Sequence, residues 1–144
     1  MEESNKDNMA TPNFQTLFND HFMEFIDAIQ TVFPENVDIM SAKNSLSAIR
    51  KANPKLIVKI WNKYIIGPYQ NEINEGNVDF FLLKDYSKDL VNANNQGQIM
   101  DAINRLRDPV SQMNPKEQQN VMKYLQNLSK LANLHFAANP SALL

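Results

Sequence analysis

The chain of 144 residues has no cysteine and only three glycines. The lack of cysteine excludes a disulfide framework, a cysteine-ligated zinc or iron–sulfur site and a thiol nucleophile, and it is typical of a reducing intracellular compartment. The scarcity of glycine leaves few positions for the tight turns that join strands. The composition therefore disfavours an all-β fold and a disulfide-rich domain.

Long apolar runs and familiar catalytic motifs are missing as well. No apolar run approaches the roughly 18–20 residues that a membrane span needs, and the polar N-terminus MEESNKDNMA does not resemble a secretion signal. The sequence holds no phosphate-binding glycine loop, no His-Glu-x-x-His and no Gly-x-Ser-x-Gly. We therefore expect no membrane insertion, no catalytic, cofactor-binding or metal-binding residues, and no enzyme activity.

The sequence does contain strong helical periodicity. Hydrophobic residues make up 43 % of the chain and charged residues 21 %, and the length suits one soluble domain. Apolar residues recur at steps of three and four, which is typical of amphipathic helices. The predicted helices span 12–33, 37–51, 54–66, 98–107 and 115–137, with a further helical turn at 69–75. We predict an all-α, single-domain bundle of about five or six helices, in which long first and last helices form much of the core.

The remaining segments are predicted from their polarity. We expect residues 1–11 to form a polar N-terminal tail, 12–138 the helical domain and 139–144 a frayed C-terminal tail. The segment NANNQGQ at 92–98 is the best candidate surface loop, because Asn and Gly favour turns. The apolar run Phe80–Leu83 fits a buried helix or a buried strand equally well.

Helix starts and inward faces can also be predicted. A polar residue followed by proline marks capped starts at Thr11-Pro12, Asn53-Pro54 and Asn114-Pro115, and Asn114 with Glu117 resembles a capping box. A kink or stop is expected at Gly67-Pro68. For the second and the last helix the expected inward residues are Met40, Leu46, Ile49, Val121, Met122, Leu125, Leu128, Leu131 and either Leu134 or His135.

Charge is unevenly spread along the chain. Residues 1–38 carry eight acids and one base, whereas residues 39–71 carry six bases and no acid. Asp20, Glu24 and Asp27 share the outer face of the first predicted helix. The chain thus has an acidic first part and a basic middle.

Three of these bases, Lys55, Lys59 and Lys63, recur every fourth residue on one side of the third predicted helix. We name them the lysine stripe. A functional interpretation is a stripe for phosphates or for an acidic partner. The alternative is a solvated helix face, compensated by the acidic face of the first helix. No arginine accompanies the lysines, so sequence-specific DNA binding is poorly supported.

Two other groups of residues permit a functional interpretation beside a structural one. His21 and Glu24 could ligate a metal, but a position flanking the core is the simpler interpretation. Trp61, Tyr69 and Tyr86 belong to an aromatic-rich stretch over 61–86. They either form a core seam or anchor a protein interface, where aromatic residues are enriched.

Several strings resemble small, Asn- and Lys-rich helical proteins of large nucleocytoplasmic DNA viruses, most of which are uncharacterised. In chain order, the strings run from Phe22 (FMEFID), Phe33 (FPE), Asn62 (NKYIIGPY), Asp79 (DFFLLKDY) and Met122 (MKYLQNL). The resemblance covers roughly residues 14–136. It implies a viral origin and brings no catalytic residues with it.

These observations favour a non-catalytic interaction or scaffold protein of a large DNA virus, as a virion component or assembly partner. Its expected location is the host cytoplasm or the virion. One alternative is an accessory nucleic-acid-associated protein that holds phosphates weakly with the lysine stripe. Another is an effector that binds a host protein through the aromatic segment. No cofactor is expected in any of these cases.

Overall fold

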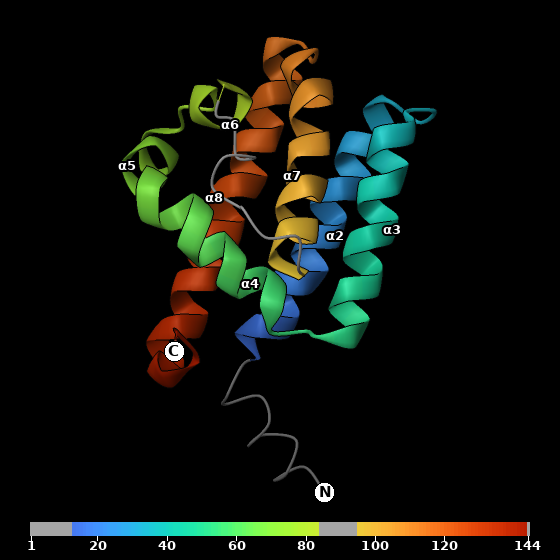
Figure 1. Ribbon diagram of the computed structural model, residues 1–144. Helices are drawn as coiled ribbons and strands as arrows, with labels where there is room; N and C mark the ends of the chain where they lie inside the picture. The colour runs from blue at the N-terminus through green and yellow to red at the C-terminus, as the bar shows by residue number, and fades with distance from the viewer. Residues whose placement is uncertain (1–12, 84–94, 144) are drawn as a thin grey trace, which may run out of the picture.

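The structure, a computed structural model, describes residues 13–83 and 95–143. Four long helices run side by side along one axis (Figure 1). They are α2 (Phe14–Val32), α3 (Val37–Ala52), α7 (Asn95–Ser111) and α8 (Pro115–Ala138). Helix α3 packs mainly against α7, and α2 packs mainly against α8. The described part of the chain contains no strand, which confirms the predicted all-α bundle with long first and last helices.

A bent helical segment follows α3 in the chain and runs across α8 (Figure 1). It comprises α4 (Leu56–Trp61), the π-helix η1 (Asn62–Ile66) and α5 (Gly67–Glu75), and the short α6 (Asp79–Leu83) follows. Proline causes the change of helix type, because Pro68 has no N–H for an α-helical bond and its ring would meet the carbonyl four residues earlier. The N–H of Gly67 bonds the carbonyl of Asn62 instead, and Tyr69 leaves helical geometry at φ −126° and ψ 24°. The predicted break at Gly67-Pro68 is thus a kink within a continuing segment.

The core is built around the apolar face of α2. Phe18, Phe22 and Phe25 are buried, and the ring of Phe22 lies 5.5 Å from the ring of Trp61, edge to face. Aromatic pairs in this arrangement are worth about 0.5–1.5 kcal/mol beyond the area that they bury. The indole N–H of Trp61 donates to the hydroxyl of Ser129 on α8 at 3.2 Å, so α4 is fixed to the two longest helices.

One of the three predicted capped helix starts is confirmed. The other two helices begin at residues other than the predicted ones. Asn114 caps α8 in a complete capping box with Glu117. The first helix begins after Asn13, whose side chain is its cap, and Thr11-Pro12 lies outside the described residues. Asn53 ends α3, and α4 begins after Lys55 without a side-chain cap. The proline at 54 therefore belongs to the turn between two helices.

One inward assignment is wrong, by one position: Met40 is 45 % exposed, and Ile39 is buried in its place. Of the two alternatives at the end of the last helix, His135 is the buried one and Leu134 is 39 % exposed. These positions lie at the margin of an apolar stripe, where a small helix rotation decides which side chain faces the core. The apolar run Phe80–Leu83, for which the sequence allowed a helix or a strand, is helical and forms most of α6.

Helix α7 is longer than predicted at both ends. It begins at Asn95, so the predicted loop 92–98 overlaps its first turn, and residues 92–94 lie outside the described part. It also continues past Pro109, which is tolerated because a proline in the last turn removes only one intrahelical hydrogen bond. The C-terminal tail differs from the expected frayed end: Pro140–Leu143 forms a 3-10 helix, η3, and Ala142 packs against the core.

Candidate functional site

Three parts of the chain meet at the lower end of the bundle in Figure 1. Helix α2 begins there, the chain turns from α3 into α4 there, and α8 ends there in η3. The side-chain amide of Asn19 on α2 donates to the carbonyl of Pro54 at 2.9 Å, which fixes the turn against the first helix. The antiparallel course of α2 and α8 thus gathers residues that are more than a hundred positions apart in the sequence.

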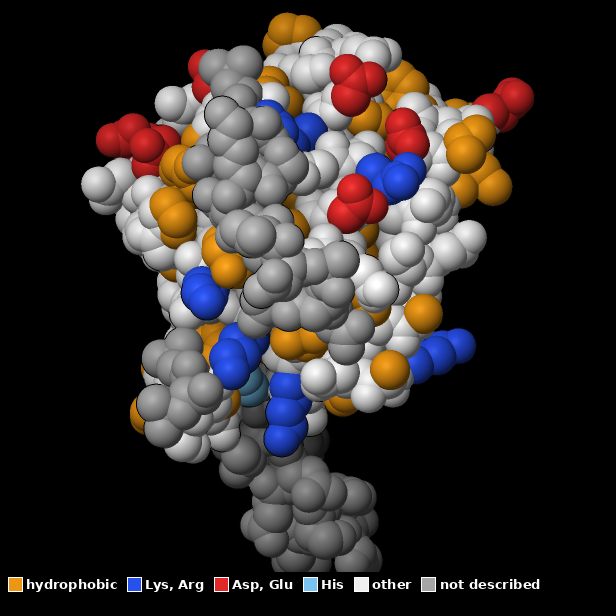
Figure 2. Space-filling model, in the orientation of Figure 1, with side chains coloured by type: hydrophobic (Ala, Val, Ile, Leu, Met, Phe, Trp, Pro, Cys, Tyr) orange, Lys and Arg blue, Asp and Glu red, His pale blue; other side chains and the backbone are white. Residues whose placement is uncertain are grey.

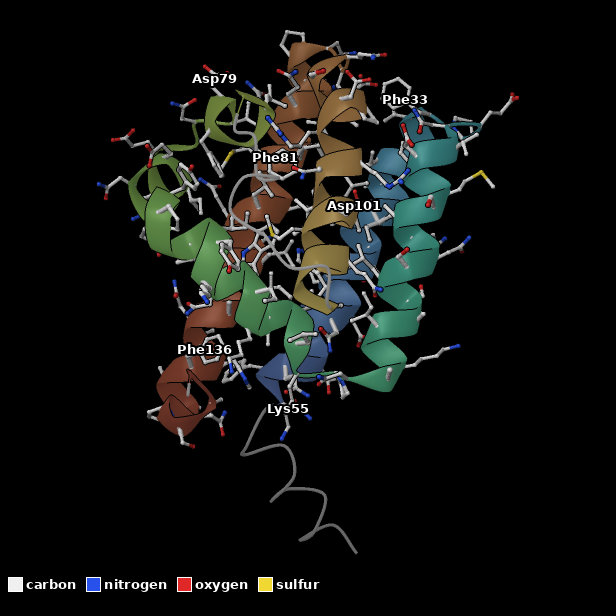
Figure 3. The ribbon with its side chains drawn as sticks, in the orientation of Figure 1. Phe33, Lys55, Asp79, Phe81, Asp101 and Phe136 are labelled. Atoms are coloured by element: carbon white, nitrogen blue, oxygen red, sulfur yellow. The ribbon has the colours of Figure 1, made fainter. Side chains whose placement is uncertain are left out.

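A pocket of about 560 Å³ opens at this end. Its walls combine cations, neutral hydrogen-bonding groups and an apolar floor, and none of the described residues that line it is acidic. Figure 3 labels Lys55 and Phe136 at this end of the bundle. The lining residues are Gln15, Asn53, Lys55, Leu56, Lys59, His135, Phe136, Asn139, Ser141 and Ala142.

The lysine stripe lies along α4 and η1, on the outer side of the bent segment. Lys55 and Lys63 are exposed and Lys59 is half-buried. Figure 2 shows basic side chains gathered over this segment. The ammonium of Lys63 lies 5.3 Å from the ring centre of Tyr64, within the range of a cation–π contact. The stripe and the pocket share Lys55 and Lys59, so they form one continuous basic surface.

The acids of α2 do not compensate this surface. Asp20 pairs with Arg50, and Asp27 pairs with Lys43 at 2.8 Å, and both of these cations belong to α3. The expectation that the acidic face of the first helix neutralises the lysine stripe is therefore wrong. The bundle geometry explains the difference, because α2 and α3 are joined by a short turn and pack directly on each other.

His135 is the buried titratable group of the pocket. Its side chain is 8 % exposed, and no hydrogen bond joins its ring to another described residue. The ring lies 4.8 Å from that of Phe136 at 67°. Burial disfavours the charged imidazole and lowers the pKa of His135 below its usual 6.5. The basic side chains in the described lining are therefore Lys55 and Lys59, with His135 favoured in its neutral form.

The structure describes two of the three candidate interface aromatics, Trp61 and Tyr69. Trp61 is fully buried and hydrogen-bonded to Ser129, so its assignment as an interface residue is wrong and the core interpretation holds for it. Tyr69 is half-buried and stacks on Phe80 with ring centres 5.2 Å apart. Tyr86 lies outside the described residues. Because Trp61 is part of the core, it is not available as an anchor for a protein interface.

The other candidate chemistry can be placed as well. His21 Nδ1 and the Glu24 carboxylate lie 2.9 Å apart and partner each other, and the His21 ring stacks on Tyr124, while His21 Nε2 is buried without a hydrogen bond. Over residues 13–83 and 95–143, no group of three or more His, Asp or Glu side chains could hold a metal ion. None of the helices in the same ranges is long and apolar enough to cross a membrane.

Sequence reasoning found part of this site. The spacing of four identified Lys55 and Lys59, but Gln15, His135 and Ser141 carry no local pattern that marks them as neighbours. Only the packing of α2 and α8 brings them together. A search against models of protein families, curated proteins and solved structures found no match. The function is therefore inferred from the geometry of this basic surface.

Proposed function

We propose that the protein is a non-catalytic interaction protein that binds an acidic surface of a partner protein through the lysine stripe. The observation that carries the proposal is the segregation of charge. Asp20 and Asp27 of α2 pair with cations of α3, whereas Lys55 and Lys63 are exposed, and the stripe continues into a pocket whose described lining has no acid. Complementary charge of this kind steers association and selects partners.

A protein partner is favoured over nucleic acid by the composition of the stripe. Nucleic-acid binding draws its affinity from many phosphate contacts and counterion release. The stripe has three lysines and no arginine, and the whole chain carries a formal charge of −2, which opposes the approach of a polyanion. A limited acidic patch on a protein matches three cations better than a long phosphate backbone does.

The resemblance to proteins of large DNA viruses supplies the setting of the proposal. In that setting the partner is a viral protein, and the chain acts in the host cytoplasm or in the virion as an assembly partner. The effector alternative has less support, because Trp61 is in the core and cannot anchor a host protein.

Cross-linking mass spectrometry on purified virions and on infected-cell lysate tests the proposal. A stripe variant replaces each lysine of the stripe with glutamine. A control variant makes the same change at three exposed lysines of α8, so both variants lose equal charge. These control lysines are Lys116, Lys123 and Lys130.

We expect an acidic viral protein to cross-link to the wild type and to the control variant, and to be lost from the stripe variant. Equal recovery of the same proteins by the stripe and control variants would contradict the proposal. Recovery that disappears on nuclease treatment, or that falls steeply with salt in the manner of phosphate binding, would support the nucleic-acid alternative instead.

A further inference from the structure

We infer that the pocket at the lower end of the bundle binds a small phosphate ester with a compact apolar body. This inference goes beyond the proposed protein partner, because it concerns the pocket rather than the outer face of the stripe. A cavity of about 560 Å³ lies within the roughly 300–1,000 Å³ of sites that bind small molecules.

The charge and donor chemistry of the walls select an anion. Lys55 and Lys59 contribute ammonium groups, Gln15 contributes an amide and Ser141 a hydroxyl, and the described lining holds no carboxylate to repel a negative ligand. Gln15 is the second residue of the 19-residue helix α2, so the pocket lies beside the positive end of this helix. No arginine is among the described lining residues, so an anion would be held by lysine ammonium groups acting as point charges, as in known lysine-based phosphate sites. A phosphate ester offers three acceptor oxygens to these donors, whereas a carboxylate offers two.

His135 is the second, independent observation that indicates a ligand. A buried polar side chain normally has a hydrogen-bond partner. His135 is 8 % exposed, lines the pocket, and its ring has no hydrogen bond to any described residue. Neither ring nitrogen is closed off inside the protein, so both are open to the solvent of the pocket. A phosphate oxygen in the pocket would replace water as the hydrogen-bond partner of a ring nitrogen.

The floor of the pocket indicates what the phosphate is attached to. Leu56, Phe136 and Ala142 line it with apolar surface. An inorganic phosphate would leave this surface facing water, whereas an ester with a ring-sized apolar group would cover it. Burial of apolar area is the term that separates the two ligands, at roughly 25 cal/mol per Å².

Binding is expected to depend on the charge of His135. Among the described lining residues the other charged groups are Lys55 and Lys59 of the α4 region, while α2 and η3 contribute uncharged residues. An anion beside His135 favours the imidazolium form and opposes the effect of burial. Linkage then requires binding of the phosphate dianion to tighten as the pH falls through the pKa of His135 in the complex, by up to tenfold for each unit by which binding raises that pKa. The ligand's own second ionisation, with a pKa of about 6, is measured separately and subtracted.

NMR titration of the full chain with phenyl phosphate tests the inference. Phenol, which lacks the phosphate, and inorganic phosphate, which lacks the ring, are the control ligands. We expect saturable shifts at His135 and Ser141 with phenyl phosphate, weaker binding of inorganic phosphate and no binding of phenol. The pair Lys55→Gln/Lys59→Gln should weaken phenyl phosphate at least about tenfold, on the basis of two lost charge-assisted contacts. The matched pair Lys116→Gln/Lys123→Gln should leave the affinity unchanged.

The inference is overturned if phenyl phosphate gives no saturable shift at His135, or if both lysine pairs lower its affinity equally. It is also overturned if phenol binds as well as phenyl phosphate, because the site would then be merely apolar. Lys63→Gln separates this inference from the proposed function. Lys63 belongs to the stripe but does not line the pocket, so its loss should weaken the protein partner and spare phenyl phosphate.

Discussion

Replacing Ser129 with alanine probes the contact that joins α4 to α8. The indole N–H of Trp61 donates to the Ser129 hydroxyl at 3.2 Å, and the two residues are 0 % and 2 % exposed. Alanine leaves the N–H without an acceptor in a site closed to water. An unsatisfied buried donor costs about 1–3 kcal/mol. For a chain of this size each kcal/mol lowers Tm by about 3 °C, so we expect a drop of about 3–9 °C.

A double-mutant cycle isolates the hydrogen bond from the change in packing. Trp61→Phe removes the donor, so Ser129→Ala should cost less in that background than in the wild type. We expect a coupling energy of about 1 kcal/mol or more, as for residues in direct contact. Urea unfolding followed by circular dichroism gives the four free energies of unfolding. Because the chain has a single tryptophan, fluorescence adds an independent signal from the same site in the two variants that retain it.

Two results would refute this reasoning. A coupling energy near zero would mean that the bond is absent or that water replaces it without cost. Ready quenching of the Trp61 emission by acrylamide in the folded wild type would place the indole at the surface, where the interface interpretation had it. A change in the slope of the urea transition, rather than in its midpoint, would show that the mutation altered compactness and would remove the basis for comparing free energies.

Three further predictions concern stability. Gly76 has φ +74°, so Gly76→Ala should lower the free energy of unfolding in urea by about 1–2 kcal/mol. Gly67 has helical geometry and room for a Cβ, so Gly67→Ala should be neutral or stabilising. Equal effects of the two substitutions would contradict this prediction. Asn114→Ala removes the cap of α8 and should lower the free energy of unfolding by about 0.5–2 kcal/mol; no change would exclude the capping box. Burial lowers the pKa of His135 in the folded chain, so as the pH falls the unfolded chain takes up this proton at a higher pH than the folded chain does. The free energy of unfolding should therefore decrease as the pH drops through 6.5. His135→Gln should flatten that part of the pH profile, and an unchanged slope would argue against a buried His135.

The long helices could be predicted because their periodicity is uninterrupted. The apolar residues of α2 and α8 recur at three and four over the whole helix, and the bounds agree with the structure to within two residues. The capping box at Asn114 and Glu117 needs only four neighbouring residues, so it too is visible in the sequence. Features that depend on neighbouring residues alone were thus recoverable.

Features set by the packing of distant segments were not recoverable. Whether Ile39 or Met40 faces inward depends on where α7 lies against α3, and the local pattern allows both. The π-helix before Pro68 follows from how the chain relieves the proline, which composition does not specify. The same limit applied to Trp61, since an aromatic residue can be core or interface and only the position of α8 decided between them.

In the candidate site, too, the sequence predicts the features that depend on neighbouring residues and does not predict those that depend on packing. A spacing of four identified the lysine stripe without any structure. Its neutralisation by the acids of the first helix was a reasonable expectation, and the direct packing of α2 on α3 reversed it. The pocket required residues from both ends of the chain, Gln15 and Ser141 among them, which no local pattern connects.

The affinity of the cross-linked partner for the wild type, the stripe variant and the control variant tests the central claim most directly. Exposed ion pairs contribute about 0.2–1 kcal/mol each, so loss of three should weaken binding by about 3- to 150-fold. Biolayer interferometry at physiological and at high salt should show this loss for the stripe variant, a smaller difference at high salt, and no loss for the control variant. If the two variants weaken binding equally, or if neither does, the lysine stripe is a solvated face and the proposed function is wrong.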